Sequence, residues 1–419
     1  MKRFMLLAFS FLILQGVCAQ QITLEECRQK AQNNYPLVVQ YDLVEKSKEY
    51  NLGNASKGYL PQFSLTGKAT YQSDVTKLPI QIPDVDIKGL SKDQYQVMLE
   101  LNQKIWDGGD IRYQRKQIKA TSDIDREQLN VDMYALNDRV NQVYFGILML
   151  DEKLKQNNLL REDLQRSYQQ VSAYMANGVA NQSDLDAVKV EQLNTRQSET
   201  ELLSSRGAYI QMLSLLIGED ISRETTLLKP VATEMTLAED INRPELSLFD
   251  AQRESLDISE STLRVRNLPK LGAFIQGAYG NPGLNMLKNE FTPFYIAGVR
   301  LTWNFGSLYT LRNDKRVIEN NRQKLQSNRE LFLFNTRLEA TQENSAIQSV
   351  RALMREDDEI IALRTNIRKA AEAKVANGTL TVTDMLREIT AESLARQTKA
   401  MHEVQLLMNI YQWKHTTNN

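Results

Sequence analysis

The order of short motifs in the first half of the chain returns in the second half, about 200 residues later. Leu60-Pro61, for example, returns as Leu268-Pro269, 208 residues on. Three further pairs keep the same order: Asn34-Tyr35-Pro36 with Asn242-Arg243-Pro244, Trp106-Asp107-Gly108-Gly109 with Trp303-Asn304-Phe305-Gly306, and Ala176-Asn177-Gly178 with Ala376-Asn377-Gly378. Each motif is loose, but the shared order predicts two copies of one structural unit.

Two stretches, 110–176 and 308–376, are predicted to be uninterrupted helices. All nine prolines lie outside 84–229 and 294–419, and the two stretches together contain a single glycine. Apolar residues recur at spacings of three and four, as in Val140, Val143, Tyr144, Ile147, Leu150 and Leu154. Each helix would be about 100 Å long at about 1.5 Å per residue. Such a length is typical of a bundle or a tube, and not of a globular domain.

Each long helix is predicted to end at its Ala-Asn-Gly motif and to turn back as a helical hairpin, with turns at 177–183 and 377–383. Glycine supplies the left-handed backbone that ends a helix. Ser183 or Thr383 is expected to cap the returning helix, with Asp184 or Asp384 in its first turn. Capping alone would account for these residues, and a functional role for the two aspartates is the alternative.

Four segments between the helices alternate between polar and apolar residues: 61–71, 94–106, 270–279 and 294–305. Their polar faces carry Ser64, Thr66, Lys68, Glu100, Asn102, Arg300 and Thr302. Strands of about ten residues with aromatic ends are typical of a barrel with a lipid-facing wall and a wet lumen. A soluble sheet with one buried face is the alternative. Four strands cannot close a barrel with a polar interior, so a barrel would need several chains.

The first 19 residues are predicted to be a secretory signal peptide. Lys2 and Arg3 precede an apolar run, and Val17 and Ala19 place small residues at a cleavage site. Cys18 leaves lipid attachment open as a less favoured alternative. Removing the two basic residues from the 51 in the chain leaves 49 against 52 acidic residues, a net charge of −3. Nucleic-acid binding is therefore not indicated.

These features resemble the TolC family of outer-membrane efflux proteins. The resemblance covers about 23–413 and rests on the Leu-Pro pairs, the Asn-Gly hairpins and the strand-to-helix turns. The residues of those turns are Trp106, Gly108, Gly109, Trp303 and Gly306. The resemblance implies a mainly α fold with a membrane β-barrel portion, in which three copies share a twelve-stranded barrel and a helical tunnel. It also implies a location in the outer membrane that extends into the periplasm, in contact with outer-membrane lipid.

The resemblance further implies the exit duct of a tripartite efflux or type I secretion system, with an inner-membrane pump and a periplasmic adaptor, or membrane fusion protein, docked at its tip. It divides the chain into a signal peptide (1–19), a first repeat (20–217), an equatorial segment (218–242) and a second repeat (243–419). The residues after about 405 would join the equatorial belt.

The resemblance also implies a gate at the hairpin tips. The tips carry Asn177, Gly178, Asn377 and Gly378, with Asp184 and Asp384 after them. The family often closes this end with an Asp-x-x-Asp pattern, and here the second position is Arg387. Arg387 is expected to pair with Asp384, within its chain or across an interface, and to weaken an acidic ring there.

Other classes of function are less favoured. His402 and His415 are expected to be exposed polar residues, and no spacing of His, Cys, Asp or Glu predicts a metal site, a cofactor or an enzyme. A secreted coiled-coil structural or adaptor protein without a pore is the remaining alternative, because it would share the helices and the signal peptide.

Overall fold

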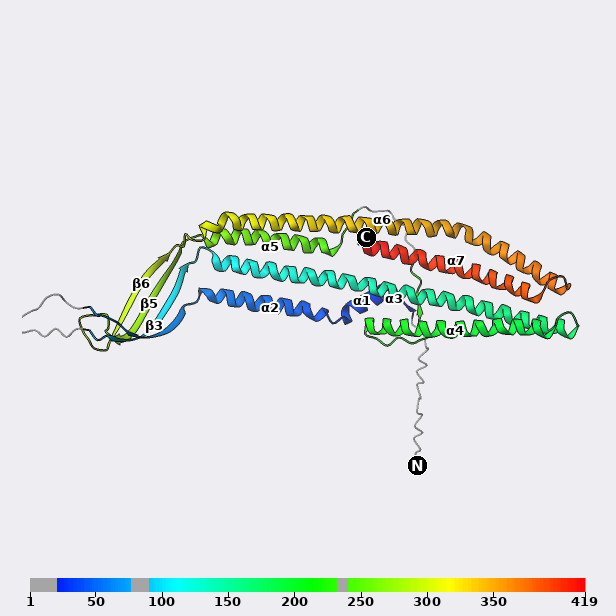
Figure 1. Cartoon of the computed structure of the whole chain (residues 1–419), viewed down its shortest axis with the longest axis horizontal. Helices are drawn as coiled ribbons and strands as arrows, with labels where there is room; N and C mark the ends of the chain where they lie inside the picture. The colour runs from blue at the N-terminus through cyan, green and yellow to red at the C-terminus, as the bar shows by residue number, and fades with distance from the viewer. Residues whose placement is uncertain (1–20, 77–89, 232–239, 419) are drawn as a thin grey trace, which may run out of the picture. The chain divides into compact units, whose positions relative to one another are not determined.

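The computed structural model describes residues 21–76, 90–231 and 240–418. The signal peptide predicted at 1–19, with Cys18, lies outside the described residues. The described helices are α1 (Leu24–Asn34), α2 (Val38–Ser56), α3 (Asp110–Ala176), α4 (Gln182–Ile217), α5 (Pro244–Arg266), α6 (Leu308–Ala376) and α7 (Val382–Thr417), with a 3-10 turn at Lys57–Tyr59. The strands are β1 (Gln21–Ile22), β2 (Gln62–Tyr71), β3 (Asp93–Trp106), β4 (Thr226–Leu227), β5 (Lys270–Asn281) and β6 (Thr292–Thr302) (Figure 1).

The order of the elements repeats once along the chain. The run α2-β2-β3-α3-α4 is followed by α5-β5-β6-α6-α7. The helices predicted at 110–176 and 308–376 are confirmed as α3, with 67 residues, and α6, with 69 residues. The duplication of motifs in the sequence is thus a duplication of structure.

The chain forms two compact units, and neither unit is a single repeat. The sheet unit comprises the described parts of 39–130 and 244–331, and the hairpin unit comprises the described parts of 1–38, 131–243 and 332–419. Each unit takes segments from both repeats, and the long helices α3 and α6 contribute to both units.

In the sheet unit, the four longer strands form one antiparallel sheet in the order β2-β3-β5-β6. Strand β6 ends at Thr302, so the strand predicted over 294–305 was too long at its end. Its partner β5 begins at Lys270, directly after Pro269, and Lys270 pairs with Thr302. Residues 303–305 therefore have no pairing position in β5, and the chain turns at 306–307 before α6 begins.

In the hairpin unit, α3 turns back into α4, and α6 turns back into α7 (Figure 1). Near the two turns the four helices share one apolar core, made of Leu164, Val171, Leu185, Val188, Val375, Val382, Met385, Leu386 and Ile389. Further along α3, the predicted seam is buried at Val140, Val143, Tyr144 and Ile147. None of the described helices combines the length and the apolar character needed to cross a membrane.

Candidate channel wall and hairpin tips

The register of the sheet places all seven predicted polar-face residues on one face. Ser64 pairs with Glu100, and Asn102 lies two residues further along β3 on the same side. Between strands β5 and β6, Lys270 pairs with Thr302, and Arg300 lies two residues before Thr302 on the same face. The paired positions of one face therefore bring together side chains that are more than 200 residues apart in the sequence.

Arg300 is held in place near one end of this polar face. Its guanidinium carbon lies 4.7 Å from the ring centroid of Phe274, and its Nη1 lies 3.8 Å from Oε1 of Glu100. Asn102 Nδ2 donates a hydrogen bond of 2.8 Å to the same carboxylate oxygen. A Cβ at Gly298 would lie 3.1 Å from the Phe274 ring, so the glycine makes room for the aromatic platform. A cation above an aromatic face is an attractive arrangement that fixes where the charge lies.

The opposite face of the sheet is apolar and strongly exposed in the single chain. Phe63, Leu65 and Tyr71 of β2 are 70%, 73% and 74% exposed, and Tyr295 of β6 is 76% exposed. Exposed apolar area of this extent marks an interaction surface in a folded protein. One face of the sheet thus suits an apolar environment, and the other suits water.

The predicted strand-to-helix turns are found at Trp106 and at Trp303. The register shifts between Lys104 and Trp106, and this irregularity pairs Trp106 with Leu271. Gly108 and Gly109 then adopt left-handed backbone, with φ of 72° and 94°. Such a backbone disfavours any residue with a Cβ.

The buried Asp107 starts α3, because its carboxylate accepts hydrogen bonds from the amides of Gly109 and Ile111, each at 2.8 Å. In the second turn Asn304 Oδ1 accepts from the amide of Gly306 at 2.9 Å, and Trp303 Nε1 donates to the Asn267 carbonyl at 3.1 Å. The two turns therefore use an Asp or Asn side chain for the same purpose, although only the first contains left-handed glycines.

Each hairpin turn ends its long helix at the predicted glycine. Gly178 and Gly378 have φ of 72° and 67°, and the amide of each donates to the carbonyl three residues before it, at 3.1 and 3.0 Å. The next amide in each turn reaches back five residues, at 2.9 Å in both hairpins. Both turns are thus the left-handed glycine termination known as the Schellman motif.

The residues that cap the returning helices are not those predicted from the sequence. Asn181 caps α4 and Thr381 caps α7, whereas Ser183 and Thr383 lie inside the first turn. Asp184 Oδ2 accepts from the Asn181 amide at 3.0 Å, and its own amide donates to Asn181 Oδ1 at 3.1 Å. The prediction placed each cap two residues too late. In a capping box the acidic residue lies three residues after the cap, so the position of Asp184 points to Asn181 as the cap.

Asp384 occupies the corresponding position in the second hairpin. Its amide donates to Thr381 Oγ1 at 3.1 Å, and the same hydroxyl donates to Asp384 Oδ2 at 2.7 Å. Arg387 Nη1 lies 3.4 Å from Asp384 Oδ1, and the arginine side chain is 72% exposed. An exposed ion pair of this kind contributes at most about 1 kcal/mol. The described chain therefore places a capped carboxylate and a nearby cation at this tip.

A buried carboxylate that the sequence analysis did not single out joins α6 to α7. Glu392 is 4% exposed, accepts from Thr365 Oγ1 at 2.8 Å and from Arg396 Nε at 3.0 Å, and also pairs with Arg368. Burial would raise the pKa of Glu392, but the three hydrogen bonds outweigh it and lower the pKa. The spacing of Arg396, four residues after Glu392, was the available sequence signal, although helices of this composition contain many such pairs.

Glu343 of α6 is a second partly buried acid. Its Oε1 accepts from Thr416 Oγ1 of α7 at 2.8 Å, and its buried Oε2 has no hydrogen-bond partner among the described residues. Burial raises the pKa of Glu343 to about 7, and the nearby carboxylates of Glu339 and Asp138 add to the rise. The hydrogen bond from Thr416 and the positive charge of Arg243 lower the pKa of Glu343 and offset part of this rise.

The two histidines are less exposed than predicted. His402 Nδ1 lies 2.8 Å from Oδ2 of Asp357, which is 5% exposed. The ring of His415 stacks on Tyr134 with centroids 4.4 Å apart, and the Tyr134 hydroxyl donates to the His415 carbonyl at 2.6 Å. Both side chains are tied to neighbouring helices because α7 packs against α3 and α6, which the sequence alone did not reveal.

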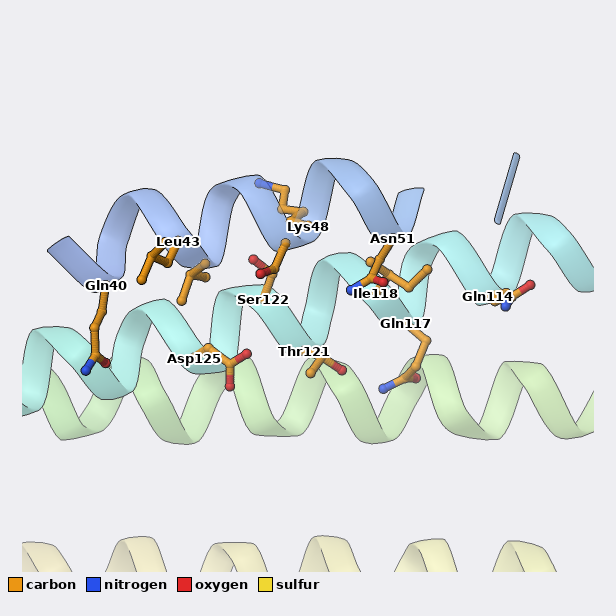
Figure 2. A pocket seen from close by; sticks show the side chains of 12 residues that line it. Gln40, Leu43, Lys48, Asn51, Gln114, Gln117, Ile118, Thr121, Ser122 and Asp125 are labelled. Atoms are coloured by element: carbon orange, nitrogen blue, oxygen red, sulfur yellow. The ribbon is translucent and has the colours of Figure 1, made fainter. Parts of the chain in front are cut away.

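A groove of about 520 Å³ runs between α2 and α3 within the sheet unit (Figure 2). Its lining is a mixture of amide, hydroxyl and aliphatic side chains, and Lys48 and Asp125 are its two charged residues. Lys48 Nζ binds Oε2 of Glu45 on its own helix at 2.9 Å. The groove thus has the chemistry of a contact between helices. Across the described parts of the chain, no cluster of three or more His, Cys, Asp or Glu side chains could hold a metal ion.

A four-stranded sheet with one polar and one apolar face, combined with two helical hairpins on long helices, is the protomer fold of outer-membrane channels. The fold is similar to that of the channel CusC (TM-score 0.70, 13% identity, 94% of this chain and 91% of that chain). It is also similar to the CmeC outer membrane channel of Campylobacter jejuni (TM-score 0.66, 13% identity, 94% and 85%) and to the outer membrane protein VceC of Vibrio cholerae (TM-score 0.66, 12% identity, 94% and 94%).

Residues 27–219 match the family model described as outer membrane efflux protein. These residues therefore form an outer membrane efflux protein domain, and the resemblance to TolC-like channels noted in the sequence is confirmed by this match and by the fold. The protein is an efflux channel of the outer membrane that extends into the periplasm. A comparison with curated protein sequences finds no significant match.

Proposed function

We propose that this protein is the exit duct of a tripartite efflux or type I secretion system and that it works as a homotrimer. Each protomer would contribute four strands to a twelve-stranded barrel and its long helices to a periplasmic tunnel. An inner-membrane pump would load the duct through a periplasmic adaptor docked at the hairpin tips. The proposal treats 20–217 and 243–419 as the two repeats, joined by an equatorial segment at 218–242.

The open edges of the sheet are the observation that carries this proposal. Strands β2 and β6 each have one neighbour within the described chain, so each presents a free row of backbone hydrogen-bonding groups. Such edges lead to pairing with another chain unless they are covered. Because the sheet has four antiparallel strands, β6 of one copy can pair antiparallel with β2 of the next. A ring of copies would satisfy both edges and leave none open.

The two faces of the sheet support the barrel orientation. The exposed apolar face, with Phe63, Leu65 and Tyr295, would meet lipid. The polar face, with Glu100 and Arg300 among the residues brought together by the register, would line a wet lumen. A soluble sheet would instead need a partner element to cover the apolar face.

The gate is proposed at the hairpin tips. Three copies of Asp384 around the channel axis would form an acidic ring, and the pairing with Arg387 would reduce its field. The matched geometry of the two tips, at Gly178 and Gly378, would allow both hairpins of each protomer to converge there.

Planar-bilayer conductance of the detergent-purified protein, with its oligomer mass determined by native mass spectrometry on the same sample, tests the function. A trimer that conducts supports the exit duct. A trimer that conducts only after the hairpin tips are altered also supports it, and locates the gate. A water-soluble monomer that does not insert into bilayers would refute the duct and favour the coiled-coil protein without a pore. Co-purification of the adaptor expressed with it tests the tripartite assembly separately.

A further inference from the structure

The polar face of the sheet carries an excess of positive charge. Its paired strand positions hold four cations, Lys68, Lys104, Lys270 and Arg300, and one carboxylate, Glu100. The paired positions of the apolar face hold one charged residue, Asp93, which pairs with Tyr71 at the end of the sheet. The charge is therefore concentrated on one side of the sheet.

Three of the four cations lie close together at one end of this face. Lys104 and Arg300 occupy the same row of the sheet, on either side of Gly272. Lys270 lies in the neighbouring row, opposite Thr302. Adjacent strands are about 4.8 Å apart, so the Cα atoms of Lys104 and Arg300 are separated by about 10 Å.

A small cavity opens between these cations. Gly272 has no side chain, and the space above it has a volume of about 180 Å³. The lining residues include Asn102, Lys104, Asp107, Lys270, Phe274, Arg300 and Thr302. The two oxygens of Asp107 already accept from the amides of Gly109 and Ile111. The three cations, the amide and the hydroxyl of the lining offer hydrogen-bond donors on several sides, as an anion requires.

Three carboxylates, Glu100, Asp107 and Asp110, lie in or beside the cavity, and the whole polar face still carries more cations than carboxylates. The side chain of Glu100 is 17% exposed and that of Arg300 is 54% exposed, so the guanidinium is more accessible to a solute than the carboxylate. Lys270 Nζ lies 2.7 Å from Asp110 Oδ2, so the charge of Lys270 is balanced by this carboxylate. With Glu100, Asp107 and Asp110 all counted, the four cations of this face exceed the carboxylates by one.

We propose that this face selects anionic solutes, and that the cavity between Lys104 and Arg300 is a binding point for a carboxylate or phosphate group. The inference rests on the proposed function, in which this face lines the lumen. Repeated by three copies, the cations would form a ring around the conduction path, and rings of charged side chains set the ion preference of channels. Arginine is suited to the role because its planar guanidinium binds carboxylate and phosphate through two parallel hydrogen bonds.

The reversal potential of the purified channel in a potassium chloride gradient across a planar bilayer tests this inference. The expected result is a preference for chloride over potassium in the unmodified channel. Exchanging both cations of the row, Lys104→Glu with Arg300→Glu, is expected to reverse the preference. Asp93→Asn is the matched control, because it changes the charge of the opposite face and should leave the preference unchanged.

A second measurement uses inorganic phosphate as the probe of the cavity. Phosphate is expected to reduce the chloride current of the unmodified channel, and Arg300→Gln is expected to abolish that reduction while the protein still conducts. A preference for potassium in the unmodified channel would overturn the inference, as would a reversal potential that does not respond to the exchange of both cations. A protein that does not conduct at all would instead refute the channel proposal, and this inference with it.

Discussion

Glu343 should make the stability of the folded protein depend on pH near neutrality. Its pKa is about 7 in the folded chain, because burial disfavours the charged form, against an ordinary pKa of 4.5 for a glutamate in water. In the unfolded chain the carboxyl loses its proton near pH 4.5, while the folded chain keeps the proton up to about pH 7. Between these two values the folded state binds more protons than the unfolded state. Stability therefore falls as pH rises through this window.

The size of the effect follows from the difference between the two pKa values. At about 1.4 kcal/mol for each unit, the shift corresponds to a free energy of unfolding lower by about 3 kcal/mol above pH 7 than below pH 4.5. Glu343→Gln keeps the shape and the acceptor for Thr416 and removes the charge. The variant should be more stable than the unmodified protein at pH 8 and nearly equal to it at pH 4.5.

Denaturant titration of the detergent-purified protein at several pH values between 4.5 and 9 measures this difference. Glu356→Gln, which changes an exposed carboxylate on the same helix, is the control and should keep the pH dependence of the unmodified protein. The reasoning about burial is refuted if the unmodified protein and Glu343→Gln lose stability equally over this range.

Three further changes test other parts of the structure. Gly378→Ala should destabilise the hairpin by about 1–2 kcal/mol, because the φ of 67° disfavours a residue with a Cβ. The added Cβ would meet no atom within 4 Å, so the loss reflects backbone strain and not a clash. Gly53→Ala, inside α2 and equally unobstructed, is the control and should not destabilise the protein in thermal melting. Glu392→Ala should cost about 3 kcal/mol and speed hydrogen exchange in α6 and α7, since it removes the buried carboxylate that Thr365, Arg368 and Arg396 share. Because the pKa of Glu392 is lowered, its contribution should be lost as pH falls below about 4.5, and a variant with unchanged exchange would contradict this. Asp384→Ala combined with Arg387→Ala should make the channel leakier, and unchanged single-channel conductance and antibiotic influx would argue against a gate at this tip.

The local order of the chain could be read from the sequence. The absence of proline and the near absence of glycine predicted α3 and α6 as uninterrupted helices, because these two residues are the ones that interrupt a helix. Alternation of polar and apolar residues placed the predicted polar-face residues on one side, because side chains in a strand alternate with a period of two. The glycines that end the long helices were found for a similar reason, since a left-handed backbone disfavours other residues.

The helix caps were predicted wrongly because they depend on hydrogen bonds between neighbouring residues. The caps were placed at Ser183 and Thr383, but Asn181 and Thr381 have the extended backbone and the bonded side chains of true caps. Several residue types can fill a cap position, so the sequence offered candidates without deciding among them. The end of β6 was likewise set by the start of its partner strand at Lys270.

By itself, the sequence determined the duplicated order of helices and strands, the hairpin turns and the two-sided character of the strands, because each depends on residues close together in the chain. Only the tertiary structure decided which distant side chains meet. Arg300 above Phe274 beside Glu100, and Glu343 beside Thr416, are contacts across strands and between helices. Their charge, burial and accessibility depend on register and packing, and these are properties of the folded chain as a whole.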